Sequence, residues 1–143
     1  MYAKDFARAY RANSILTASP GQLVLMLFDG ALKSLAIART SCDDTSGDPR
    51  RFEIIHTQIT KSQKIIAELQ GTLNMEAGGE FARTMYRLYD YYDRRLMEAN
   101  MKKQSAPIVE VERLLGEVRN AWAEMLREKD SAPSTSAALH QVA

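Results

Sequence analysis

The sequence predicts an all-α protein: an antiparallel, up-down-up-down four-helix bundle with a short N-terminal arm and a disordered C-terminal tail. Three observations predict this fold. Apolar residues recur three and four positions apart over four long stretches. Clusters of turn-forming residues separate these stretches. No stretch alternates apolar and polar residues in the way that marks a strand. Four long helices with short connections favour an antiparallel bundle, in which each helix packs beside the next.

We divide the chain into three parts. Residues 1–18 form a mobile N-terminal arm with a weak apolar pattern, in which Tyr2, Phe6 and Tyr10 would share one face of a helix. Residues 19–129 form the helical bundle domain, and a chain of 143 residues is long enough to bury one core. Residues 130–143 are small and polar, and we expect them to be disordered.

The first helix is expected from about Pro20 to Thr40. Ser19 precedes it as an N-cap, and the proline lies in the first turn, where its missing N–H costs nothing. Apolar residues cover most of the circumference and leave one narrow polar wedge with Asp29 and Lys33. We expect this wedge to face solvent, and the alternative is that it flanks a groove. A bundle helix needs an apolar stripe of only about 100–150°. This helix is therefore either the central helix of the core or carries a second apolar wall for a partner.

Three further helices are expected. Turn formers fill the loop 41–48, and Asp48 caps a second helix with Pro49 in its first turn. The second helix ends at a glycine pair in 74–79, and a third helix follows over about 80–104. Ser105 caps a fourth helix, which has Pro107 in its first turn and runs to about Glu128, with Trp122 as an expected core anchor. The other residues at core spacing are Phe52, Ile55, Ile59, Ser62, Ile66, Leu69, Leu73, Phe81, Met85, Leu88, Tyr89, Tyr92, Leu96, Ala99, Ile108, Val111, Leu114, Leu115, Val118, Met125 and Leu126.

Composition argues against several classes of protein. The net charge is +1 with both signs mixed along the chain, which disfavours a nucleic-acid surface. The single cysteine, Cys42, cannot form an internal disulfide and so favours a reducing compartment. The first residues show no signal peptide, and the apolar run Leu23–Phe28 is too short to span a membrane. We therefore expect a cytoplasmic protein without membrane insertion.

The chemistry-bearing residues do not assemble into a catalytic or cofactor site. Glu53 and His56 form the motif Glu-x-x-His, which is half of a di-iron carboxylate ligand set. A ferritin-like oxidoreductase needs this motif on two helices, and the second histidine, His140, lies in the tail. Cys42 lies in a polar loop without a nearby histidine, which disfavours a nucleophile. The sequence therefore predicts no enzyme, no cofactor and no metal.

Apolar residues outside the core stripes are the informative feature of the chain. On the second helix, Gln58 and Lys61 share the side on which this surplus lies. Three explanations stay open: a groove for an amphipathic helix of a partner, a wide core of splayed helices, or a homodimer face. An apolar arm would cover such a groove until a partner displaced it. The surplus residues that we select are Leu23, Met26, Leu27, Ile54, Ile65, Tyr86, Met97 and Met101.

From Met1 to about Glu128, the chain resembles the flagellar secretion chaperones of the FliS family. The resemblance rests on several blocks in the expected order and spacing: Met1-Tyr2, Ala9-Tyr10, LTASPGQLVLMLFDGAL at 16–32, LYDYYDRRLMEAN at 88–100 and EVERLLGEVRNAWAEM at 110–125. One departure is Tyr92, where the family more often has Met after the Tyr-Asp-Tyr unit. This departure leaves an apolar core residue in place.

The resemblance implies a flagellin-specific export chaperone. Such a protein binds the disordered C-terminal region of flagellin, prevents its polymerisation in the cytoplasm and delivers it to the flagellar type III export gate. The surplus apolar residues become the candidate flagellin contacts, and Tyr2, Phe6 and Tyr10 become candidates for docking on the gate or capping the groove. The expected state is a monomer or a weak homodimer. The alternative is a structural helical bundle that homodimerises through its extra apolar stripes.

Overall fold

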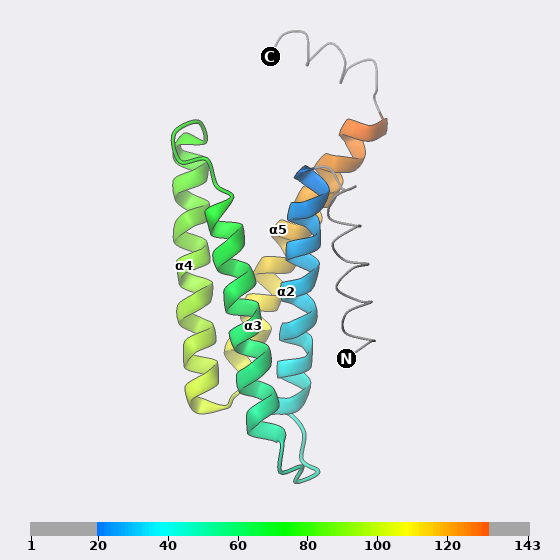
Figure 1. Ribbon diagram of the computed structural model, residues 1–143, viewed down its shortest axis with the longest axis vertical. Helices are drawn as coiled ribbons and strands as arrows, with labels where there is room; N and C mark the ends of the chain where they lie inside the picture. Colours follow the sequence, from blue (N-terminus) through cyan, green and yellow to red (C-terminus); the bar gives the residue numbers. More distant parts are fainter. Residues whose placement is uncertain (1–19, 132–143) are drawn as a thin grey trace, which may run out of the picture.

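The structure, a computed structural model, describes residues 20–131 and contains four α-helices in that part of the chain. They are α2 (Pro20–Cys42), α3 (Arg51–Gly71), α4 (Gly79–Lys102) and α5 (Ala106–Ser131) (Figure 1). The predicted all-α fold is confirmed, and no strand occurs in the described range. The arm with Tyr2, Phe6 and Tyr10 lies outside the described residues, as do residues 132–143 of the predicted tail.

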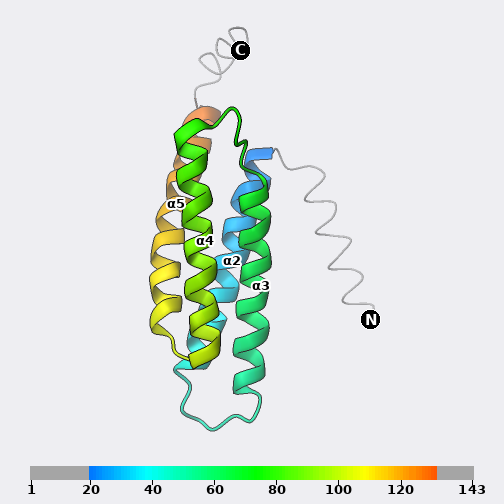
Figure 2. The same ribbon diagram turned by 90° about the vertical axis from the view of Figure 1, so that its left-hand side faces the viewer.

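The four helices form a ring of antiparallel neighbours. Helix α2 packs against α3 and α5, and α4 packs against the same two helices from the other side. Helices α2 and α4 therefore lie diagonally opposite each other. Successive helices run in alternating directions along the long axis, as the two orthogonal views show (Figures 1 and 2). This is the up-down-up-down order that short connections favour.

The helix boundaries lie close to the predicted ones, and they differ most at the start of α3 and at the end of α5. Asp48 does not cap the helix directly, because its carboxylate accepts the N–H of Arg50 at 2.9 Å and closes a turn before the helix. Helix α3 begins at Arg51, whose guanidinium donates to the carbonyls of Ser41 and Cys42 at 2.9 and 2.6 Å. These bonds tie the start of α3 to carbonyls of the last turn of α2, which lack intrahelical partners. At the other end of the bundle, α5 continues to Ser131, beyond its predicted end.

The core lies along the axis of the ring and uses one stripe from each helix. Among the predicted core residues that are fully buried are Ile55, Ile59, Tyr92 and Leu96. Burial raises the pKa of Tyr89 from its ordinary value of 10.0 to about 12, and it raises the pKa of Tyr92 as well. The ring centroids of these two tyrosines are 6.1 Å apart in an edge-to-face arrangement. The predicted stripes of α3 and α4 therefore meet in one core.

Three predicted core residues are wrong, and all three lie near helix ends. Phe52 is 59% exposed, Phe81 is 69% exposed and Met125 is 46% exposed. At these positions the bundle no longer supplies neighbours on all sides, although the helical spacing continues. The Arg51 guanidinium lies 5.2 Å from the centroid of the Phe52 ring and covers part of it. Trp122 is partly buried against the core and is not its central anchor.

Helix α2 carries more apolar surface than the core of the bundle requires. By length and mean hydropathy it is apolar enough to cross a membrane, although charged residues interrupt its apolar sequence. In the fold it is one of four packed helices, and only 28% of its most apolar window is buried. Its buried line includes Phe28, Ala31, Leu35 and Ala38 at core spacing. The remaining apolar surface of α2 is available outside the core.

Candidate binding groove between α2 and α3

An open groove of about 570 Å³ runs between α2 and α3. It extends from Leu23 to Ile37 on α2, which corresponds to about 20 Å along the helix axis at 1.5 Å per residue. That length is sufficient for a docked helix of about four turns. The lining residues are Leu23, Met26, Leu27, Gly30, Lys33, Ser34, Ile37, Gln58, Lys61, Ile65 and Glu68.

The depth of the groove depends on a glycine in the middle of α2. Gly30 presents no side chain, and a Cβ atom placed there would lie 3.4 Å from the Cδ1 atom of Ile65. The two helices thus approach closely at this level, while larger side chains rise on either side of it. Met26 is 41% exposed and Ile37 is 40% exposed, so the walls present apolar surface to solvent.

The structure brings four of the eight selected apolar residues together. Leu23, Met26 and Leu27 line the groove from α2, and Ile65 faces them from α3. Ile54 belongs to a separate cavity at the end of the bundle that contains the α2–α3 loop, beside Arg51. The angular position of Ile54 resembles that of Ile65, but the two residues differ in height along the helix.

The other three selected residues lie on a different surface. Tyr86, Met97 and Met101 are 42%, 50% and 80% exposed on α4. Because α4 lies diagonally opposite α2, these side chains cannot line the α2–α3 groove. They form an exposed apolar stripe of their own. All eight residues remain candidates for partner contact, but the structure places them on more than one surface.

Sequence reasoning missed several polar residues of the groove. Lys33 was expected on a solvated face, yet it lines the rim. Gln58 and Lys61 also line the groove, and their position beside Ile65 on the helical wheel was the signal that could have found them. The Oε1 atom of Gln58 is buried without a hydrogen-bond partner. A buried acceptor without a donor is unusual and marks a position that the fold alone does not optimise.

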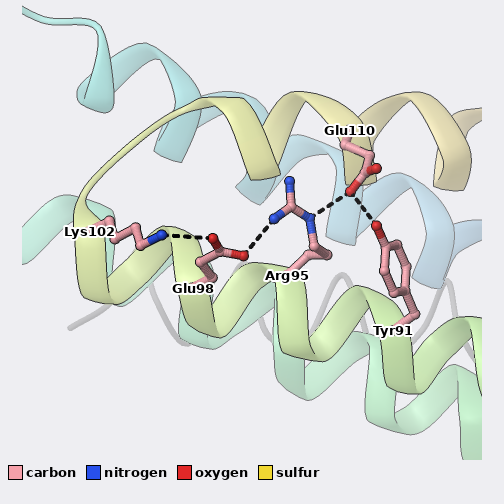
Figure 3. Close-up of polar contacts among 5 residues, drawn as sticks. All are labelled: Tyr91, Arg95, Glu98, Lys102 and Glu110. Atoms are coloured by element: carbon pink, nitrogen blue, oxygen red, sulfur yellow. Dashed lines mark hydrogen bonds and ion pairs between the residues drawn. The ribbon is translucent and has the colours of Figure 1, made fainter.

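The opposite seam, between α4 and α5, is held by a polar network (Figure 3). Glu110 accepts from the Tyr91 hydroxyl at 2.8 Å and from Arg95 Nε at 2.7 Å. Arg95 Nη1 also pairs with Glu98 at 2.5 Å, and Lys102 pairs with the same carboxylate at 2.9 Å. Arg95 and then Tyr91 lower the pKa of Glu110, while Lys102 and Arg95 lower the pKa of Glu98. The charged Glu110 carboxylate therefore links α5 to α4, while Glu98 joins Arg95 and Lys102 within α4.

The seam between α2 and α5 is also bridged, in contrast to the groove. Arg39 pairs with Glu112 at 2.7 Å, and Arg119 pairs with Asp29 at 2.8 Å. The indole N–H of Trp122 donates to a carbonyl of the first α2 turn at 2.9 Å. Within the described residues, no ion pair crosses from α2 to α3. The α2–α3 surface is thus the one on which α2 leaves its apolar side chains open.

Of the residues considered for catalysis, Glu53, His56 and Cys42 lie in the described part of the chain, and His140 lies outside it. Glu53 and His56 are both exposed, and the histidine Nδ1 lies 2.9 Å from the side-chain nitrogen of Asn100. Burial raises the pKa of the Cys42 thiol, which favours the neutral, unreactive form. Within the described residues, no cluster of histidine, cysteine and acidic side chains is arranged to hold a metal ion.

Comparison with known proteins identifies the family of this chain. The sequence model of the family described as flagellar protein FliS matches residues 2–129. This chain belongs to the FliS family. The match extends from the N-terminal arm through all four helices of the bundle. The resemblance inferred from the sequence blocks is therefore confirmed.

Curated FliS proteins match most of the chain. The flagellar secretion chaperone FliS of Bacillus subtilis is 36% identical over 121 residues, which cover 85% of this chain and 86% of that protein. The FliS of Salmonella typhimurium is 37% identical over 123 residues, covering 85% of this chain and 87% of the relative. The FliS of Escherichia coli is 32% identical over 131 residues, covering 88% and 93%. This four-helix bundle therefore belongs to a family of flagellar secretion chaperones.

Proposed function

We propose that this protein is an export chaperone for flagellin. It binds the disordered C-terminal region of flagellin, prevents premature polymerisation in the cytoplasm and delivers its client to the flagellar type III export gate. The names of the relatives support a role in flagellar secretion. Membership of the FliS family, which the sequence resemblance had implied, supports flagellin as the client.

The observation that carries this proposal is the apolar groove between α2 and α3. A client segment that is disordered alone loses conformational entropy when it folds, so it must bury a large apolar surface on the chaperone. The groove offers exposed side chains such as Met26 and Ile37 over a length that matches an amphipathic helix. Methionine side chains adapt to irregular surfaces and so suit a client of variable sequence.

Other candidate contacts extend the proposed client path. Ile54, Tyr86, Met97 and Met101 lie outside the groove, and a client that wraps around the bundle would reach them successively. The arm residues Tyr2, Phe6 and Tyr10 are proposed to cap the groove or to dock on the export gate. An arm that occupies the groove competes with the client, so displacing it reduces the apparent affinity.

The proposed function requires no catalytic step and no cofactor of the chaperone. A segment held in the groove is withheld from filament assembly by occupancy alone. Release then depends on competition or unfolding at the export machinery. The monomer or weak homodimer expected from the sequence is compatible with a client that binds one bundle at a time.

Calorimetric titration with a peptide of roughly 60 residues from the C-terminus of the same organism's flagellin tests the proposal. A helix of that length would be longer than the bundle, so the peptide is long enough to wrap around it. We expect one-to-one binding with a strongly negative heat-capacity change, because apolar surface is buried. Met26→Glu, in the groove, should weaken binding about tenfold or more, because it buries an unpaired charge. Val109→Glu is the matched control, since Val109 is 48% exposed on α5 and does not line the groove.

The contrary result is equally clear. An absence of peptide binding by the well-folded protein, with self-association in sedimentation experiments, would refute the chaperone proposal. The extra apolar surface would then belong to a homodimer of a structural bundle. Equal effects of Met26→Glu and Val109→Glu would show that the client binds elsewhere than in the α2–α3 groove.

A further inference from the structure

We propose that Lys33, Lys61 and Gln58 form a carboxylate-binding end of the α2–α3 groove. This end receives an acidic side chain of the docked segment and so fixes the direction in which that segment lies. The inference rests on the proposed function, because it concerns the segment that occupies the same groove. It adds to that function a rule for recognition, in which apolar contact supplies affinity and one ion pair supplies orientation.

The groove is chemically different at its two ends. Gly30 of α2 lies level with Ile65 of α3, and the helices are antiparallel. Moving toward the C-terminal half of α2 therefore reaches Lys33 and Lys61 at about the same height. Moving the other way reaches the apolar residues of the first turns of α2, of which Leu23 is the farthest. A docked segment thus meets only apolar α2 side chains at one end and, at the other end, two lysines beside Ile37.

The two lysines form no ion pair among the described residues, and Asp29, one helical turn before Lys33 on α2, pairs instead with Arg119 of α5. Both lysines are exposed at the groove. Glu68 is the one carboxylate that lines the groove, and it lies seven residues from Lys61 on α3, about 10 Å along the helix axis. Glu68 therefore lies at the apolar end of the groove. The cationic end therefore attracts a carboxylate from outside.

Gln58 adds a neutral donor to the same end. Its Oε1 atom is buried without a partner, and its Nε2 atom is not among the buried, unpaired atoms. Because Gln58 lines the groove, this N–H₂ group is available to a docked side chain. Ser34 contributes a hydroxyl at the same level. Ammonium and amide donors, without a neighbouring acceptor charge, match the acceptor-only chemistry of a carboxylate.

The arrangement predicts a pattern in the docked segment. Its apolar side chains should cover the end of the groove at Leu23 and Leu27. An acidic residue should follow or precede them by about two helical turns, which brings it to the lysines. A segment docked in the reverse direction would place its carboxylate against Glu68 and apolar side chains between two lysines. The charges therefore favour one direction over the other.

Charge reversal on α3 tests the inference with a matched control. The experiment titrates wild-type protein, Lys61→Glu and Lys64→Glu with the C-terminal flagellin peptide described above. Lys64 is exposed on the same helix but does not line the groove, so both variants change the net charge equally. We expect Lys61→Glu to lower the affinity about tenfold or more, as for a lost charge-assisted contact, and Lys64→Glu to lower it less than about threefold. Lys33→Glu should behave like Lys61→Glu.

A compensating change in the peptide identifies the carboxylate. Each acidic residue of the peptide is replaced by lysine in turn, and one replacement should restore binding to Lys61→Glu while weakening binding to the wild type. Gln58→Leu provides an independent readout. It should raise the melting temperature, because it removes the unpaired acceptor, and should lower peptide affinity, because it removes the donor.

The outcomes separate this inference from the function on which it rests. If the wild type does not bind the peptide, the proposed function fails. If the wild type binds and Met26→Glu does not, while Lys33→Glu, Lys61→Glu and Lys64→Glu all bind as well as the wild type, the chaperone proposal stands. The carboxylate-binding end is then refuted. It is refuted equally if no acidic residue of the peptide shows compensation.

Discussion

The glycine at the middle of the groove offers a test in which stability and binding change in opposite directions. Gly30 lies in the interior of α2, where the flexibility of glycine costs helix stability. Replacement by alanine removes this cost and adds one methyl group to the floor of the groove. The protein should therefore become more stable and bind its client less tightly.

The size of the effect follows from two contributions. Exchanging glycine for alanine inside a helix stabilises it by about 0.8–1.0 kcal/mol. The new Cβ atom would lie 3.4 Å from Ile65 Cδ1, which is a tight contact, but this methyl terminates a flexible side chain beside open space. We expect a net gain of about 0.5–1 kcal/mol, which raises the melting temperature by about 2–5 °C.

Thermal unfolding followed by circular dichroism measures the stability, and Gly116→Ala is the control. Gly116 lies within α5, and a Cβ atom there would meet nothing within 4 Å. This control should show the full stabilisation expected from the higher helix propensity of alanine, without a change in peptide affinity. Gly30→Ala should weaken peptide binding about threefold or more. A lower melting temperature for Gly30→Ala than for wild type would refute the argument that Ile65 yields. Unchanged affinity would show that the client does not reach the floor of the groove.

Three further predictions concern the bundle itself. Leu35→Ala removes a fully buried side chain and should lower the free energy of unfolding by about 2–5 kcal/mol in urea titrations, whereas a loss below about 1 kcal/mol would contradict its place in the core. Trp122→Phe removes the donor to the Gly21 carbonyl and should lower the free energy of unfolding by about 1 kcal/mol. Trp122→Ala should lower it by about 2–3 kcal/mol, which is less than for a fully buried ring because the indole is only partly buried. Stability should be fully present below pH 10 and fall as the pH rises toward 12, because the Tyr89 phenol titrates at 10.0 when unfolded and at about 12 when buried. Tyr89→Phe should reduce this alkaline loss in unfolding experiments across that range, and an unchanged loss would refute the assignment.

The bundle could be predicted from sequence because its core obeys one local rule. Ile55, Ile59 and Ile66 recur at helical spacing, and all three are fully buried. Phe52 obeys the same spacing but is largely exposed, because it lies at an end of the bundle. The spacing of apolar residues in one helix carries no information about where the neighbouring helices end. The Trp122 prediction failed for a similar reason. The residue lies on the correct face of α5, but at the part of that helix that pairs with the first turn of α2 rather than with the centre of the core.

The candidate groove was predictable only in part, because it depends on the pairing of helices. A helical wheel shows that Leu23 and Ile65 stand outside the core stripes of their helices, but it does not show that these stripes face each other. It also treats Ile54 and Ile65 as equivalent, although they stand eleven residues, or about 16 Å, apart along α3. The gap at Gly30 and the unpaired Gln58 oxygen emerge only when α2 and α3 are placed side by side.

The excess hydrophobicity of α2 and its groove have one physical explanation. A helix that served only the core would carry mainly polar residues on its remaining faces, as α5 does with Arg113, Glu117 and Asn120. Helix α2 instead keeps Met26 and Ile37 exposed, and its composition reaches that of a membrane span although most of its apolar window is not buried. Such a surface promotes aggregation unless a segment covers it. Ion pairs bridge α2 and α5, whereas the groove beside the α2–α3 contact is lined by apolar side chains, so this part of the apolar surplus lies where a client segment can bury it without disturbing the core.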